Sequence, residues 1–289
     1  MPEEPRVTAP DEPRVRVHRG DGGVVRVVLD RPAARNALDL PMCHQLRDAF
    51  EELDADPEVR VVLLAASGPA FCAGADLKER TGRDESWVRR RRLAAYAAYE
   101  AVERCAKPVV ACVHGPVVGS GGEIAMACDF VLAADTTTFR FPEPRWGTVG
   151  ATQRLQRVAG KRRAKELLFT GRELGVAEAR EIGLVARVVP ADELETAAAG
   201  LAEHVAQAPP LALALTKQAI DLGEEVDLDR GVRIEAAAVE RLLADGGWRR
   251  GVAAFTSGRT DHRDGTGDAG KAGDTGGTGG AGGPNGTEQ

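Results

Sequence analysis

The sequence predicts an α/β protein in which a core of alternating strands and helices is followed by a purely helical region. The core is indicated by two apolar runs, 59–65, which is broken only by Arg60, and 108–113, and such runs are typical of strands buried on both faces of a sheet. Segments with helical spacing separate these runs, as in chains built of βα units. The helical region is indicated because strand-like runs stop at Pro209-Pro210.

Each element follows from its local pattern. Residues 24–29 form a β-branched run closed by Asp30-Arg31-Pro32, which predicts a strand. Residues 40–55 predict a helix, because their apolar residues recur at helical spacing. In chain order, the other predicted elements are helix 85–105, strand 108–113, helix 122–127, strand 130–133, helices 153–169 and 176–182, strand 184–189, helix 192–206, and helices 211–222, 228–243 and 248–256.

Both ends of the chain have compositions typical of disorder. Residues 1–13 contain four prolines and predict an extended leader. Residues 263–289 are rich in Gly, Thr and Asp and lack aromatic and large aliphatic side chains, so they cannot bury enough surface to offset their ordering entropy. We therefore expect a disordered leader at 1–13, an α/β core at 14–207, a helical region at 208–262 and a disordered tail at 263–289.

The composition excludes several classes of protein. A net charge of −6 gives no general reason to expect binding to nucleic acid. No run of 18 or more apolar residues exists, and the acidic, proline-containing N-terminus does not resemble a signal peptide. The five cysteines include no Cys-x-x-Cys pair, which argues against a disulfide framework and a zinc site. We expect a cytoplasmic protein that binds neither nucleic acid nor a membrane.

Two loops are rich in small residues where a core element would not require them. Residues 71–78 follow the strand at 59–65, and residues 114–123 follow the strand at 108–113. Loops at the carboxyl ends of strands are where open α/β sheets bind ligands, and small residues allow a ligand to approach backbone N–H groups. One N–H group from each loop could form an oxyanion hole. For either loop alone, a tight turn without a ligand is the favoured interpretation.

The spacing of the residues excludes three other motifs. Residues 119–124 lack the third glycine of a dinucleotide fingerprint, and no Gly-Lys-Ser/Thr of a phosphate-binding loop follows. A nucleophile elbow around Ser120 would need glycine two residues before and after it, but Val118 occupies the first of these positions. Ser120 is therefore not predicted to be a nucleophile.

Two glutamates complete the candidate site. Glu123 lies in a stretch of small apolar residues at the start of a predicted helix, and Glu143 lies between two prolines. One interpretation of a carboxylate near a helix N-terminus is that it is a capping acid and nothing more. Beside an oxyanion hole, however, partly desolvated glutamates are suited to acid–base catalysis near neutral pH.

Residues 14–262 resemble the crotonase (enoyl-CoA hydratase/isomerase) superfamily. The resemblance rests on motifs that occur in the expected order: 29–32 with 35–38, 71–78, Gly115 with 119–129, Pro142-Glu143, and 152–155. It implies a crotonase-like spiral of repeated ββα units with a C-terminal helical trimerisation region. It also implies a homotrimer or homohexamer.

The resemblance assigns roles to individual residues. The backbone N–H groups of Ala75 and Ser120 would hold the thioester oxygen, and Glu123 and Glu143 would add water across a 2,3-double bond. The Ala73 carbonyl would contact the adenine of coenzyme A. Further contacts to the nucleotide and phosphates would come from Ala34, Arg35 and Lys78. Coenzyme A is part of the substrate in this scheme, so no cofactor and no metal ion is expected.

Two departures from the family pattern limit this expectation. The loop between Glu143 and Gln153 is shorter than usual, and together with Trp146 it could reshape the acyl pocket. Near the C-terminus, residues 256–259 replace the commoner Glu-Lys-Arg stretch. An altered pocket could promote another crotonase-type reaction, isomerisation or thioester hydrolysis, and this is the first alternative. A non-catalytic oligomeric scaffold is the second, and the pair Glu123 and Glu143 argues against it. The four arginines 89–92 could touch CoA phosphates, but a solvated helix face is the favoured interpretation.

Overall fold

The computed structural model describes residues 13–256 of the chain. The predicted tail at 263–289 and all of the predicted leader except Pro13 lie outside these residues. The main sheet has six strands in the order β1-β2-β3-β4-β6-β9. Its first pair is antiparallel and the other neighbours are parallel. The strands are β1 (Val15–Arg19), β2 (Val24–Leu29), β3 (Val61–Ala66), β4 (Val109–Val113), β6 (Phe130–Ala134) and β9 (Arg187–Val189).

The central strands are buried on both faces, which explains their continuous apolar runs. Val62 and Leu64 of β3 face one core, which includes α1 (Leu40–Ala55) and α2 (Glu85–Arg104). Their neighbours Val61 and Leu63 face a second core against α6 (Leu194–Ala206). The two strands predicted from the apolar runs are thus confirmed, because successive strand residues alternate between two buried layers.

A second sheet of three short strands positions the candidate site. Its order is β5-β7-β8, with β5 at Pro116–Val118, β7 at Thr138–Arg140 and β8 at Glu173–Gly175. Strand β5 leads through Gly119 into α3 (Ser120–Ala127). These strands were not predicted, because three residues are too few for a periodic pattern.

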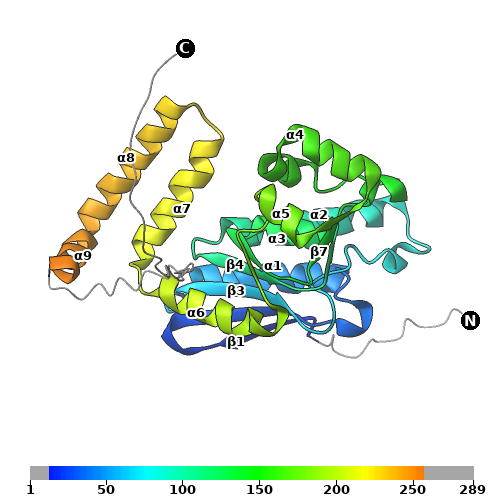
Figure 1. Cartoon of the computed structure of the whole chain (residues 1–289), viewed down its shortest axis with the longest axis horizontal. Helices are drawn as coiled ribbons and strands as arrows, with labels where there is room; N and C mark the ends of the chain where they lie inside the picture. Colours follow the sequence, from blue (N-terminus) through cyan, green and yellow to red (C-terminus); the bar gives the residue numbers. More distant parts are fainter. Residues whose placement is uncertain (1–12, 257–289) are drawn as a thin grey trace, which may run out of the picture. The chain divides into compact units, whose positions relative to one another are not determined.

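The remaining helices match the predicted order. Helices α4 (Thr152–Thr170) and α5 (Val176–Glu181) follow the second sheet, and α7 (Pro210–Glu224) and α8 (Leu228–Asp245) lie side by side as a hairpin (Figure 1). The described residues divide between a unit that ends at Gly247 and a second unit that begins at Trp248 and contains most of α9 (Gly247–Thr256). The α/β core followed by a helical region is confirmed.

Two differences from the predicted bounds concern the site. Helix α3 begins at Ser120, two residues before the predicted start, because Gly119 adopts φ +48° and ψ −108° and ends the preceding strand. A 3-10 helix, η3 (Lys78–Arg80), follows the first small-residue loop, and another, η4 (Glu143–Trp146), begins at the second glutamate. The remaining 3-10 helices of the described residues are η1 (Asp21–Gly23), η2 (Pro32–Ala34) and η5 (Ala191–Glu193).

Between residues 13 and 256, no helix has the length and apolar character needed to cross a membrane.

Candidate active site

The two small-residue loops lie side by side, as their positions after neighbouring strands predicted. The N–H of Val118 donates to the carbonyl of Cys72 at 2.9 Å, which joins the second loop to the first. The contact requires glycine: a β-carbon on Gly121 would lie only 2.7 Å from the Cys72 carbonyl oxygen, and one on Gly74 would lie 3.1 Å from that of Val118. Small residues in both loops therefore allow this close approach.

The backbone N–H of Ala75 is left out of the pairing that holds its loop. Leu38 donates its N–H to Gly74 at 2.8 Å and accepts from the N–H of Asp76 at 2.9 Å. In this parallel bridge the residue between the two partners, Ala75, directs its own N–H away from Leu38. Ala75 instead lines a cavity of about 80 Å³.

Ser120 contributes the second N–H group. It is the first residue of α3, where a backbone N–H has no acceptor within the helix. Ser120 lines the same cavity as Ala75, together with Glu123 and Glu143. The structure thus brings the four predicted catalytic residues to one small cavity, and their individual roles stay a prediction.

Glu123 is a buried carboxylate on α3. Its side chain accepts a hydrogen bond from the backbone N–H of Ala151. Burial raises its pKa, and this effect is opposed by the Ala151 hydrogen bond and by the charges of Arg154, Arg92 and Arg91. Only 6% of Glu123 is exposed, so a carboxylate at this position interacts strongly with whatever shares the cavity.

Glu143 is the more strongly perturbed of the two. Burial, with a contribution from the nearby charge of Glu123, raises the pKa of Glu143 to about 7. Its Oε2 atom is buried and has no hydrogen-bond partner among the described residues. A carboxyl group with a pKa near neutrality and an unused oxygen is suited to move a proton to or from a ligand.

The short loop after Glu143 contacts both glutamates. A β-carbon on Gly150 would lie 3.0 Å from Cγ of Glu143, and Ala151 donates to Glu123. Ala151 adopts φ +56° where the loop enters α4, an unusual conformation for a residue with a β-carbon. The shorter loop therefore packs against Glu143 and donates a hydrogen bond to Glu123, so it helps to position both carboxylates.

Arg92 fastens this loop to α2. Its Nη1 donates to the Val149 carbonyl at 2.9 Å, and its Nη2 donates to the Thr148 hydroxyl at 2.6 Å. Arg92 also lines the cavity, and its positive charge opposes the rise in the pKa of both glutamates. It combines a positioning role for the loop with an electrostatic effect on the site.

The interpretation of residues 89–92 as a solvated helix face is wrong for half of the run. Arg89 and Arg90 are exposed, whereas Arg91 is only 2% exposed and pairs with Glu79 at 2.6 Å. Arg91 also donates to the carbonyl of Leu38, the residue that bridges to Ala75. Helical spacing could have identified Arg91, because it shares a face with the buried residues Ala95, Ala98, Tyr99 and Val102.

Tyr99 is a further residue that sequence reasoning missed. It is 1% exposed, and its hydroxyl forms a hydrogen bond with the side chain of Ser120. Burial and the charge of Glu123 raise the pKa of Tyr99, so its hydroxyl keeps its proton at neutral pH. The Ser120 hydroxyl thus has a structural partner, consistent with the prediction that Ser120 is not a nucleophile.

The residues predicted to bind coenzyme A lie mostly outside the small cavity. Ala73 lines it and donates its N–H to the Arg35 carbonyl at 2.9 Å. Ala34 is half-buried on η2, and Arg35 and Lys78 are exposed. Their roles in binding the nucleotide stay predictions.

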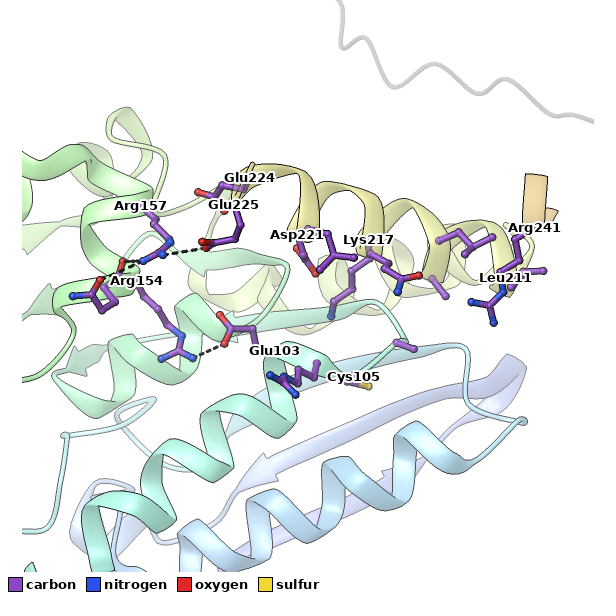
Figure 2. Close-up of a pocket in the computed structure, with 17 residues that line it drawn as sticks. Glu103, Cys105, Arg154, Arg157, Leu211, Lys217, Asp221, Glu224, Glu225 and Arg241 are labelled. Atoms are coloured by element: carbon purple, nitrogen blue, oxygen red, sulfur yellow. Dashed lines mark hydrogen bonds and ion pairs between the residues drawn. The ribbon is translucent and has the colours of Figure 1, made fainter. Parts of the chain in front are cut away.

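A larger cavity, of about 780 Å³, lies elsewhere, between α7 and the ends of α2 and α4. Figure 2 shows its charged lining, in which Arg154 pairs with Glu103 and Arg157 pairs with Glu225. Ala75, Ser120 and the two glutamates of the small cavity do not line it. The candidate chemistry is therefore confined to the smaller cavity.

Comparisons with known proteins identify the family of the chain. Residues 19–264 match the family model for enoyl-CoA hydratase/isomerase. The chain is 38% identical over 249 residues to the enoyl-CoA isomerase/hydratase fer4 of Mycosarcoma maydis, a match that covers 82% of this chain and 91% of the relative.

Solved structures give the same result for the fold. The crystal structure of an enoyl-CoA hydratase from Bacillus anthracis has a TM-score of 0.83 at 37% identity, covering 86% of this chain and 98% of the other. An enoyl-CoA hydratase from Mycobacterium smegmatis has a TM-score of 0.82 at 32% identity, covering 85% of this chain and 97% of the other. The chain therefore has the predicted crotonase fold and belongs to the enoyl-CoA hydratase/isomerase family.

Proposed function

We propose that this protein is an enoyl-CoA hydratase, which adds water across the 2,3-double bond of a 2-enoyl-CoA thioester. The observation that carries the proposal is the pair Glu123 and Glu143 in one cavity with Ala75 and Ser120. Hydration needs an acid, a base and a site for negative charge on the thioester oxygen. This cavity contains groups for all three.

The thioester carbonyl is polarised by the N–H groups of Ala75 and Ser120, which stabilise the enolate that forms when C3 is attacked. Glu123 acts as the base and accepts a proton from the water as the water oxygen bonds to C3. Glu143, which is mostly protonated below its pKa of about 7, donates a proton to C2. One water is added in total, and the proton on Glu123 returns to Glu143 before the next cycle.

The Oε2 atom of Glu143, which has no partner within the described part of the chain, supports this assignment of roles. A buried carboxyl oxygen without a partner is costly unless a ligand or water occupies its hydrogen-bonding direction. Substrate water in the cavity would relieve this cost. Coenzyme A enters only as the thiol part of the substrate, and the scheme uses no other cofactor.

Isomerisation of the double bond is the second candidate. A carboxyl group with a pKa near 7 can move a proton between C2 and C4 without any water being added. The name of the Mycosarcoma maydis relative includes both activities. A non-catalytic scaffold is not favoured, because it has no use for two buried glutamates beside free N–H groups.

We also propose that the protein assembles as a homotrimer or homohexamer. Helix α8 has no buried residue, and four of its large apolar side chains are exposed: Leu228, Val232, Val239 and Leu243. These residues recur at helical spacing and form an apolar stripe that a second copy could cover. Light scattering at several protein concentrations measures the assembly directly.

The test of the activity uses crotonyl-CoA and longer 2-enoyl-CoAs, with loss of the enoyl absorbance as the signal. Separate incubation with 3-enoyl-CoAs detects an isomerase. We expect Glu123→Gln and Glu143→Gln each to lower kcat by about 10²–10⁴-fold. Full activity in both variants would contradict the mechanism, and no turnover of any 2-enoyl-CoA would contradict the hydratase assignment.

A further inference from the structure

Two arginines line the same cavity as the two glutamates. Arg80 is the last residue of η3, and Arg92 extends from α2. Neither forms an ion pair with an acidic residue between 13 and 256. The cavity therefore contains two guanidinium groups that the catalytic scheme does not use as acid or base.

The hydrogen-bonding groups and the charge of Arg92 already have partners among neighbouring residues. Its guanidinium bonds to Thr148 and Val149 and lies 5.8 Å from the centre of the Tyr96 ring. Its charge acts on both glutamates. In this environment Arg92 holds the short loop and partly balances the carboxylates.

Arg80 differs from Arg92 in its hydrogen bonding. Its Nε is buried and has no hydrogen-bond partner among the described residues. The adjacent acid, Glu79, is already engaged, because it accepts from Arg91 at 2.6 Å and from the backbone N–H of Leu40 at 2.9 Å. A half-buried guanidinium with an unused donor requires an acceptor to offset its desolvation.

The surroundings of Arg80 also favour an anion. Burial and the like charges of Arg91 and Arg92 lower the pKa of Arg80, and the charge of Glu79 opposes them only in part. The cations that act most on Glu123 are Arg154, Arg92 and Arg91, and the one that acts on Glu143 is Arg92. The charge of Arg80 is thus available to a ligand.

We propose that Arg80 makes this site selective for short 2-enoyl-CoA thioesters whose acyl chain ends in a carboxylate. The inference rests on the proposed function, because the Ala75 and Ser120 N–H groups then fix the thioester end of the chain. The acyl group extends from there past the glutamates, into a cavity of about 80 Å³ that admits only a short chain. A terminal carboxylate so near two glutamates needs a cation, and Arg80 supplies it through a charge-assisted hydrogen bond.

Two substrates of similar shape test the selectivity. One is 4-carboxy-2-butenoyl-CoA, and the other is 2-hexenoyl-CoA, in which an ethyl group replaces the carboxylate. We expect kcat/KM for the anionic substrate to exceed that for the neutral one by at least about 10-fold. The Arg80→Met variant should lower this ratio by about 10- to 100-fold, and Arg80→Lys should restore part of it.

A matched control is Arg89→Met. Arg89 is an exposed arginine outside the small cavity, so its replacement should change neither the ratio nor the activity. Thermal unfolding of each variant shows whether it is folded.

The outcomes separate the inference from the function it rests on. Hydration of both substrates without a preference for the anionic one would overturn the inference and leave the hydratase assignment intact. If Arg80→Met lowered kcat/KM equally for both substrates, Arg80 would contact the coenzyme A part that they share. This result would also overturn the inference. If neither substrate turns over, calorimetric binding of 4-carboxybutanoyl-CoA and hexanoyl-CoA still measures the preference, and equal affinities would refute it.

Discussion

The carboxylate of Glu143 packs directly against the backbone of Gly119, so closely that a β-carbon on Gly119 would lie 2.8 Å from Oε1. Gly119 is also the residue whose left-handed φ of +48° turns β5 into α3. The same glycine thus sets the direction of the Ser120 N–H and the position of the second glutamate. This contact joins the two halves of the candidate site.

Gly119→Ala is expected to lower kcat by about 10- to 100-fold, because the methyl group displaces the Glu143 carboxylate from its place in the cavity. The unfavourable backbone conformation should also cost about 1–3 kcal/mol of stability. Steady-state kinetics and chemical denaturation measure the two effects. The control is Gly200→Ala in α6, where a β-carbon meets no other atom within 4 Å and activity should be unchanged.

The rate should fall as the pH rises through about 7. Glu143 acts as an acid in the proposed mechanism, and its pKa of about 7 means that the neutral form is lost above this pH. The dependence of kcat/KM on pH should therefore have an alkaline limb near neutrality. A profile that is flat from pH 6 to 9 would show that a neutral Glu143 is not required.

Glu143→Gln should stabilise the fold at neutral pH although it damages activity. In the folded protein the pKa is about 7, against an ordinary value of 4.5, so between these values the unfolded chain releases the proton while the folded protein keeps it. The raised pKa of Glu143 therefore does not change the free energy of unfolding below pH 4.5. It lowers this free energy increasingly between pH 4.5 and 7. Above pH 7 the loss is constant, at about 1–3 kcal/mol. The difference in Tm between variant and wild type should grow over this window, and a difference independent of pH would show that the raised pKa of Glu143 is not its cause.

Arg92→Met should move the alkaline limb to higher pH and lower kcat. The charge of Arg92 opposes the rise in the pKa of Glu143, so its removal lets that pKa increase further. The loss of the bonds to Thr148 and Val149 should loosen the loop and lower kcat by roughly 10-fold. Arg92→Lys keeps the charge, so the limb should stay near its wild-type position, and a large shift in this variant would argue against the electrostatic explanation.

Arg91→Met is expected to destabilise the protein by about 3–5 kcal/mol, because it removes one partner of a largely buried ion pair and leaves Glu79 without its counter-charge. Chemical denaturation measures this cost. The double variant Arg91→Met with Glu79→Gln should recover part of the loss, since no uncompensated charge remains. Equal destabilisation in the single and double variants would indicate that the hydrogen bond to Leu38 accounts for the effect.

The local pattern of the sequence was sufficient for the central strands and most helices. β3 and β4 were predicted because residues buried on both faces produce an uninterrupted apolar run. The three-residue strands β5, β7 and β8 were not predicted, because such short segments pair through contacts with distant parts of the chain. β1 was missed because only Val15 of its five residues is buried.

The sequence by itself determined the order of the central strands and most helices, the two small-residue loops and the candidacy of Glu123 and Glu143, because each of these depends on residues close together along the chain. Only the tertiary structure decided the pKa of Glu143, the attachment of the short loop to Arg92 and the lack of a partner for Nε of Arg80 among residues 13–256. These properties depend on burial and on charges from different elements. The electrostatic field at a site is the sum of contributions from residues far apart in sequence, and the fold alone brings them together.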